Sequence, residues 1–129
     1  MSLIKAQLAL PFAQAIDRVT EALKTEGFGI LSQIDVQAAL REKIGENIPA
    51  YRILGACNPK LAHRAVTSDP DIGRFLPCNV LVREDGPGKV AVVFADPLML
   101  TAETDNPQLQ EVAAEAHERL SRVRDALAA

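Results

Sequence analysis

Two cysteines, each followed by an asparagine, form the part of the sequence whose residue types are most suited to chemistry. Cys57-Asn58 lies in the segment YRILGACNPKLAHRA, and Cys78-Asn79 lies in DPDIGRFLPCNV. Asn58 followed by Pro59 is typical of the first residues of a helix, so Cys57 directly precedes a helix N-terminus. The positive end of a helix dipole lowers the pKa of a nearby thiol. Because the thiolate is the reactive form, this arrangement suits nucleophilic or redox chemistry.

Basic side chains accompany Cys57 in the same segment. Arg52 precedes it, and Lys60 and Arg64 follow it. A helix N-terminus has unpaired backbone N–H groups, and with cations nearby it is a ready site for a small anion. The candidate site predicted from the sequence therefore consists of Arg52, Cys57, Asn58, Lys60, Arg64, Cys78 and Asn79.

Two other interpretations of the cysteines are open. Alternation along the expected strands places Cys57 with Ile53 and Cys78 with Val80, so that both thiols point into an aliphatic core. Free cysteine in such a core behaves as a small hydrophobe, and burial raises its pKa. A metal site of Cys57, Cys78 and His63 is also conceivable. Since no ligand spacing supports it, we expect no metal and no cofactor.

The elements that must position these residues alternate along the chain. Strands are expected over 3–9, 28–34, 51–57, 77–84 and 89–95. Helices are expected to begin at Pro11, after Asp35, at Pro59 and after Asn106, and glycines at 27 and 45 end the first two. Asp85-Gly86-Pro87-Gly88 predicts an antiparallel hairpin of the last two strands. The order β-α-β-α-β-α-β-β-α predicts a two-layer α+β fold, a mixed sheet with helices packed on it.

Apolar stripes mark the buried face of each expected helix. Val36, Leu40 and Ile44 form such a stripe in the second helix. The last helix has the longest stripe, over residues 109–127, which either covers the sheet or pairs with a second subunit.

Length and composition narrow the class of protein. The chain of 129 residues is expected to form a single domain over 1–129. Its net charge of −3 and 4% aromatic content argue against nucleic-acid binding. No apolar run reaches the roughly 20 residues of a membrane span, so we expect no membrane partner. With only two cysteines, a reducing compartment, and hence the cytoplasm, is the expected location.

Three segments of the sequence carry a family resemblance. EGFGILSQIDV, YRILGACNPKLAHRA and DPDIGRFLPCNVLV resemble the family called domain of unknown function 302, over nearly the whole chain. The resemblance implies a small bacterial or archaeal α+β protein that forms a homodimer. It implies no activity, cofactor or catalytic residue.

Two hypotheses for the function follow. The first is a homodimeric ligand-binding or interaction module, with a pocket for a small anionic ligand near Cys57-Asn58-Pro59. The alternative is a thiol-dependent enzyme, or a sulfur- or redox-handling protein, that uses Cys57 with or without Cys78. A purely structural subunit is a third interpretation, and no feature of the sequence argues for it or against it.

Overall fold

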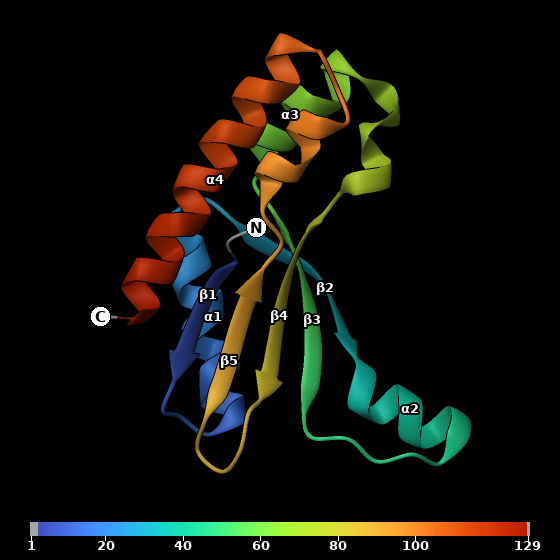
Figure 1. Ribbon diagram of the computed structural model, residues 1–129, viewed down its shortest axis with the longest axis vertical. Coiled ribbons are helices and arrows are strands. Elements are labelled where there is room, and N and C mark those ends of the chain that lie inside the picture. The colour runs from blue at the N-terminus through green and yellow to red at the C-terminus, as the bar shows by residue number, and fades with distance from the viewer. Residues whose placement is uncertain (1–2, 129) are drawn as a thin grey trace.

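A five-stranded sheet organises the chain in the computed structural model, which describes residues 3–128 (Figure 1). The strands follow one another in the spatial order β1-β5-β4-β3-β2. Their bounds are Ile4–Leu8 for β1, Gly29–Asp35 for β2, Tyr51–Cys57 for β3, Cys78–Glu84 for β4 and Val90–Phe94 for β5.

All four strand pairings are antiparallel. The predicted α+β class is confirmed, and so is the β4–β5 hairpin, in which Val82 is opposite Val92. The expected mixed sheet is wrong. Helices that alternate with strands usually make crossovers between parallel strands. Here β1 and β2, which α1 (Phe12–Thr25) separates, lie at opposite edges of the sheet. The helices between β2 and β3 and between β3 and β4 are excursions between antiparallel neighbours, and the last helix follows β5.

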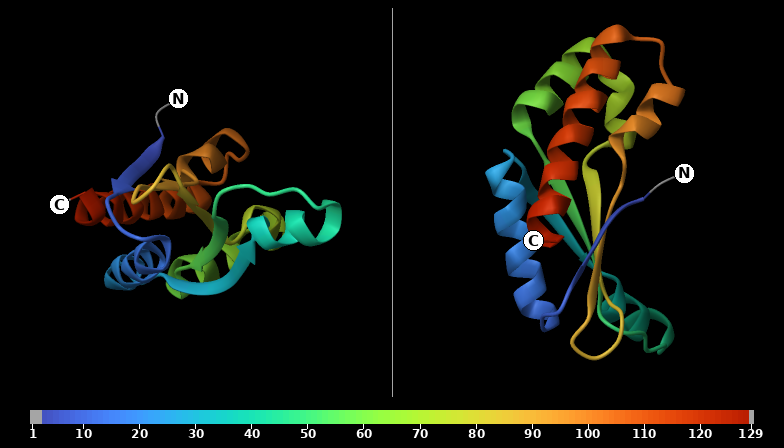
Figure 2. Two further views of the ribbon diagram at one scale, coloured as in Figure 1. Left: turned by 90° about the horizontal axis from the view of Figure 1, so that it is seen from below. Right: turned by 60° about the vertical axis from the view of Figure 1, so that its left-hand side comes forward.

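One face of the sheet is covered by α1 and by α4 (Pro107–Ala128) (Figure 2). Alternate residues of the strands point into this layer, and the apolar stripe of α1 meets them there, as its spacing predicts. The resulting main core is aliphatic and includes Leu8, Ile16, Val19, Leu23, Leu54, Val80, Val82, Val92, Leu120, Val123 and Leu127.

A second, smaller core lies beyond the ends of the strands. There α3 (Pro59–Ser68) and the 3₁₀ helices η1 (Pro70–Phe75) and η2 (Pro97–Ala102) surround the first half of α4 (Figure 1). The α4 stripe therefore serves both cores and is buried within the chain. The second core consists of Leu61, Ala65, Ile72, Leu109, Val112 and Ala116.

The helix α2 (Val36–Ile44) departs from the expectation that its stripe is buried. Asp35 caps it by accepting from the Ala38 N–H at 2.9 Å, and Gly45, at φ 70°, ends it, both as expected. None of its residues is buried, however, and Ile44 is 66% exposed. The reason is positional: α2 projects from the β2 edge of the sheet (Figure 1), so that Val36 and Leu40 are only half-buried and Ile44 is exposed.

Replacing Gly55 tests the close packing at the centre of β3. A Cβ at Gly55 would collide with Ser32 Oγ and would lie 2.8 Å from Cγ of Pro77. We expect Gly55→Ala to lower the free energy of unfolding by about 1–3 kcal/mol, the usual effect of overpacking. Urea denaturation measures it, with Gly29→Ala in β2 as control, because a Cβ there meets no atom within 4 Å. Equal effects of both substitutions would contradict the prediction.

Candidate functional site

An apolar cavity of about 300 Å³ lies between the end of the sheet and the second core. Helices α3 and α4 form two of its walls, and η1, η2 and the ends of β3 and β4 complete it. Its lining comprises Phe28, Leu31, Ala56, Cys57, Asn58, Leu61, Ala62, Ala65, Ile72, Leu76, Pro77, Cys78, Pro97, Leu100, Leu109, Val112, Ala113 and Ala116.

The lining is aliphatic almost throughout, with no charged side chain. Leu61, Ala65 and Ala113 are buried in its walls, whereas Leu31 is 70% exposed and marks the rim. The polar side chains that line the cavity are those of Asn58 and the two cysteines. Such a surface can accept apolar groups, and it offers no charge to compensate an ion.

Asn58 holds the beginning of α3 in place beside the cavity. It is only 9% exposed, and its Oδ1 accepts from the Leu61 N–H at 3.3 Å, the predicted helix cap. Its Nδ2 donates to the Glu26 carbonyl at 3.3 Å, a contact that the sequence did not indicate. Gly27, at φ +85°, allows this approach, since a Cβ there would lie 3.0 Å from Nδ2. The Asn58 amide is therefore occupied by structural bonds.

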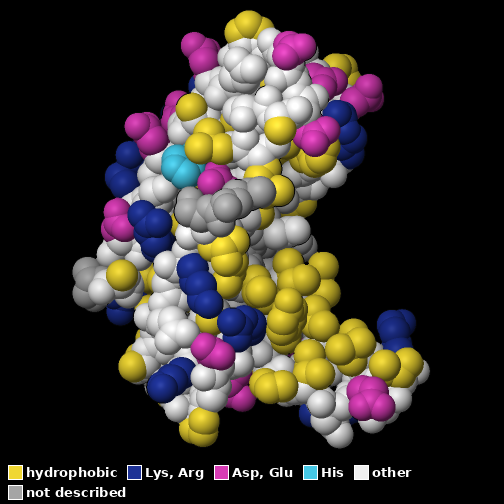
Figure 3. Space-filling model, in the orientation of Figure 1, with side chains coloured by type: hydrophobic (Ala, Val, Ile, Leu, Met, Phe, Trp, Pro, Cys, Tyr) yellow, Lys and Arg dark blue, Asp and Glu magenta, His cyan; other side chains and the backbone are white. Residues whose placement is uncertain are grey.

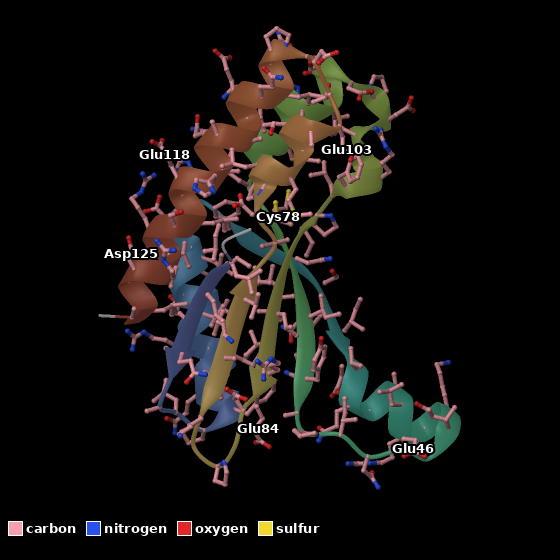
Figure 4. The ribbon with its side chains drawn as sticks, in the orientation of Figure 1. Glu46, Cys78, Glu84, Glu103, Glu118 and Asp125 are labelled. Atoms are coloured by element: carbon pink, nitrogen blue, oxygen red, sulfur yellow. The ribbon has the colours of Figure 1, made fainter. Side chains whose placement is uncertain are left out.

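Cys57 and Cys78 both line the cavity and both are half-buried (Figure 4 labels Cys78, where the strands meet the helices). The predicted strand faces are correct for Cys78, which pairs with buried Ala56, and wrong for Cys57. The core side of β3 is that of Leu54 and Ala56, and Cys57 reaches the cavity only as the last residue of the strand.

The local environment makes the Cys78 thiol a weaker acid than a free cysteine. Burial, and secondarily the nearby Cys57, raises the pKa of the Cys78 thiol from 9.0 to about 11. At neutral pH Cys78 is therefore protonated and a poor nucleophile.

The structure does not bring the predicted basic residues to the cavity. Arg52 lies at the other end of β3, 3.6 Å from the Asp35 carboxylate. Arg64 binds two carboxylates of α4, those of Glu111 and Glu115, each at 3.5 Å. Neither arginine lines the cavity.

Two further members of the predicted site occupy exposed positions. Lys60 lies in the first turn of α3, beside Asn58, with its side chain in solvent. Asn79 is exposed on β4 opposite Gly55, on the face of the sheet away from α1. Of the predicted site residues, the structure thus joins Cys57, Asn58 and Cys78 at the cavity.

Most of the lining was missed from the sequence. The α4 stripe and the Asp-Pro starts of η1 and η2 are recognisable, but no local pattern shows that these elements face one another. One bond fixes part of this arrangement: Asp96, which caps η2, lies 2.8 Å from Nδ1 of His117 on α4. The pair holds Pro97 and Leu100 of η2 against the cavity.

Among residues 3–128 no three His, Cys, Asp or Glu side chains lie close enough together to hold a metal ion, and His63 is not grouped with the two cysteines. None of the described helices is both long and apolar enough to cross a membrane.

The fold and the cavity define a class: an α+β protein with an antiparallel sheet, helices on one face and an apolar cavity at the end of its strands. The sequence model of the family described as "Domain of unknown function DUF302" matches residues 4–127, and the chain belongs to this family. It is similar to an uncharacterized conserved DUF302 protein from Bacillus stearothermophilus, whose crystal structure aligns with a TM-score of 0.84 and 33% identity over 94% of each chain. No curated protein matches.

Replacing Asn58 tests its role at the cavity wall. Asn58→Ala removes the α3 cap and leaves the Glu26 carbonyl without one donor, so we expect a loss of about 1–2 kcal/mol in unfolding free energy. Asn79→Ala is the matched control, because this second asparagine after a cysteine is exposed. Chemical denaturation of both variants decides: an Asn58→Ala protein as stable as the control would refute the structural role.

The raised pKa of Cys78 predicts a loss of stability in alkali. The folded state holds the thiol proton more tightly than the unfolded chain, so this stabilisation is complete below pH 9 and lost as the pH rises toward 11. The difference in unfolding free energy between the wild type and Cys78→Ala should therefore shift against the wild type between pH 8 and pH 10.5. Cys57→Ala serves as the comparison. A pH-independent difference for Cys78→Ala would contradict the assigned environment.

Proposed function

We propose that this protein is a small ligand-binding module, homodimeric and cytoplasmic, whose ligand occupies the apolar cavity beside Cys57, Asn58 and Cys78. The observation that carries the proposal is the cavity itself, about 300 Å³ in volume and lined without a single charged side chain. Its volume lies at the lower end of the range of small-molecule pockets, about 300–1,000 Å³. Two free thiols are in keeping with a reducing compartment.

The volume supports a ligand on energetic grounds. Protein interiors are close-packed, with few voids larger than a water molecule. The cavity is open at the rim formed by Leu31, so solvent reaches its apolar lining. A ligand that displaced this solvent would bury apolar surface, which contributes about 25 cal/mol per Å².

The lining supports an uncharged, largely aliphatic ligand. A small anion, the ligand expected from the sequence, would need a cation or several donors in the cavity. The Asn58 amide is already bonded to Leu61 and Glu26, and Arg64 is paired with carboxylates of α4. The expected ligand is therefore an uncharged apolar molecule. A small anion is the alternative that the binding experiment below distinguishes from it.

One observation favours thiol chemistry as a second candidate function. Cys57 lines the cavity and directly precedes α3, so a bound molecule would lie next to its sulfur. The high pKa of Cys78 argues against a pair of reactive thiolates, which leaves Cys57 as the single candidate nucleophile. Thiol-reagent labelling of the native protein tests this: rapid modification of Cys57 at neutral pH supports it, and labelling only after unfolding excludes it.

Ligand binding is tested with a pair of probes that differ in charge. We expect octan-1-ol to bind, measured by calorimetry and by a rise in Tm, and octanoate to bind at least about tenfold more weakly because its carboxylate must be desolvated. Tighter binding of octanoate would establish the anionic alternative, and no binding of either would refute the apolar site.

Two neighbouring alanines of α4 provide matched variants for this test. Ala113 is buried and lines the cavity, whereas Ala114 is exposed. Ala113→Phe should fill the space and reduce octan-1-ol binding at least about tenfold, whereas Ala114→Phe should leave it unchanged. If Ala113→Phe does not fold, Ala65→Leu fills the cavity from α3. Unchanged binding by a folded cavity variant would show that the probe binds elsewhere.

A further inference from the structure

The face of the sheet opposite α1 and α4 carries apolar side chains where water would favour polar ones. An antiparallel sheet with one solvated face normally alternates apolar and polar residues. On this open face a row of four apolar residues crosses four strands in register: Ile34 is opposite Ile53, Ile53 opposite Leu81, and Leu81 opposite Val93. No helix within residues 3–128 covers this row, which we call the apolar row.

Helix α2 has an apolar stripe that is not buried. Its apolar stripe, Val36, Leu40 and Ile44, contains no buried residue. The helix begins directly after β2, the edge strand that contributes Ile34 to the apolar row. In Figure 3 hydrophobic side chains form a band that runs from the middle of the open face toward α2. Within the described residues the sheet thus has a face that no helix covers, and the α2 stripe is half-buried at Val36 and Leu40 and exposed at Ile44.

Within one chain the α2 stripe does not pack on the apolar row, because α2 is held away from the open face of the sheet. Asp35 is both the last residue of β2 and the α2 cap, which leaves no loop for α2 to fold back. Nε2 of Gln37 donates to the Ile48 carbonyl at 3.0 Å, which ties α2 to the segment that follows it. Within residues 3–128 no helix covers the open face, and another molecule can supply one.

A second copy of the chain supplies both missing parts at once. In a two-fold dimer the same surface serves both partners, so each α2 can meet the partner's sheet while its own sheet receives the partner's α2. The opposite side of α2, with Ala38 and Glu42, would stay in water.

The solvent-accessible surface area of the chain is larger than that expected for a compact monomer of the same mass. The chain exposes 7437 Å² at a mass of 13.9 kDa. A compact monomer of that mass is expected to expose about 6,700 Å². The excess, roughly 700 Å², is close to the area of about 800 Å² that each partner loses in a standard interface.

We propose that the homodimer forms by reciprocal docking of α2 of each copy on the apolar row of the other. The inference rests on the homodimer included in the proposed function, and it names the surface that forms it.

Three aspartate variants test the surface, with the mass in solution measured by light scattering at micromolar concentration. The wild type should have twice the 13.9 kDa of one chain. Ile44→Asp in α2 and Leu81→Asp in the apolar row should each weaken the dimer at least roughly hundredfold, since each buries an unpaired charge. Val66→Asp is the control, because Val66 is exposed on α3, outside both surfaces. If Leu81→Asp does not fold, Leu81→Thr keeps a strand-forming residue and takes its place.

Mixing the two interface variants tests whether α2 meets the apolar row of the other copy. In a mixed dimer, the intact α2 of the Leu81→Asp chain docks on the intact row of the Ile44→Asp chain. One contact is then fully restored, so the mixture should dimerise more tightly than either variant alone. A face-to-face dimer gives no such rescue and leaves Ile44→Asp dimeric, which would overturn the proposal. A monomeric wild type would refute the homodimer itself, and dimeric variants would refute only this surface.

Discussion

The side chain of Asn58 joins the segments on which the rest of the structure depends. Its Oδ1 caps α3, and its Nδ2 binds the carbonyl of Glu26, at the end of α1. The same carbonyl accepts from Nη1 of Arg119 on α4 at 3.1 Å, and the Glu26 carboxylate binds Arg122 at 2.9 Å. One residue at the α1–β2 turn thus receives bonds from both helices that wall the cavity. Because the Asn58 side chain is buried, loss of the Glu26 contact would leave its amide without this partner, whereas the carbonyl would keep its bond from Arg119 if Asn58 were replaced.

The cavity is a consequence of how the two cores are joined. Helix α4 packs on the sheet with its second half and on α3 with its first half. The elements that close the remaining sides are fixed independently: Asp96 caps η2 and meets His117, and Asn106 at the start of α4 donates to Ser68 at the end of α3 at 2.8 Å. Polar contacts thus hold α3, η2 and α4 around the space. Support of this kind for the walls suits the ligand site proposed above.

Local signals in the sequence predicted local structure well. The Asp-Gly-Pro-Gly turn gave the β4–β5 hairpin, and the caps at Asp35 and Asn58 begin their helices as expected. What failed depends on contacts distant in sequence. The strand β3 has apolar residues on both faces, Ile53 on one and Leu54 on the other, so alternation alone cannot identify its core side. An apolar stripe such as that of α2 indicates that one face of a helix packs on an apolar surface. It does not indicate whether that surface belongs to the same chain. Arg52 is near Cys57 in sequence yet at the opposite end of a strand, since each residue of a strand adds about 3.3 Å.

The rim of the cavity and the proposed dimer surface lie on the same strand. Leu31 stands at the irregularity of β2 between Ile30 and Ser32, lines the cavity and is 70% exposed, and Ile34 of the apolar row follows three residues later. In the proposed dimer the second copy would therefore sit beside the cavity rim and reduce the exposure of Leu31. A ligand that contacts Leu31 would then bind the dimer and the monomer with different affinities. By linkage, the factor by which dimerisation changes ligand affinity is the factor by which the ligand changes the dimerisation constant. The exposure of apolar residues on the edge strand β2 would thus have one physical explanation in the two proposals, since a ligand on one side and a second chain on the other would complete its packing.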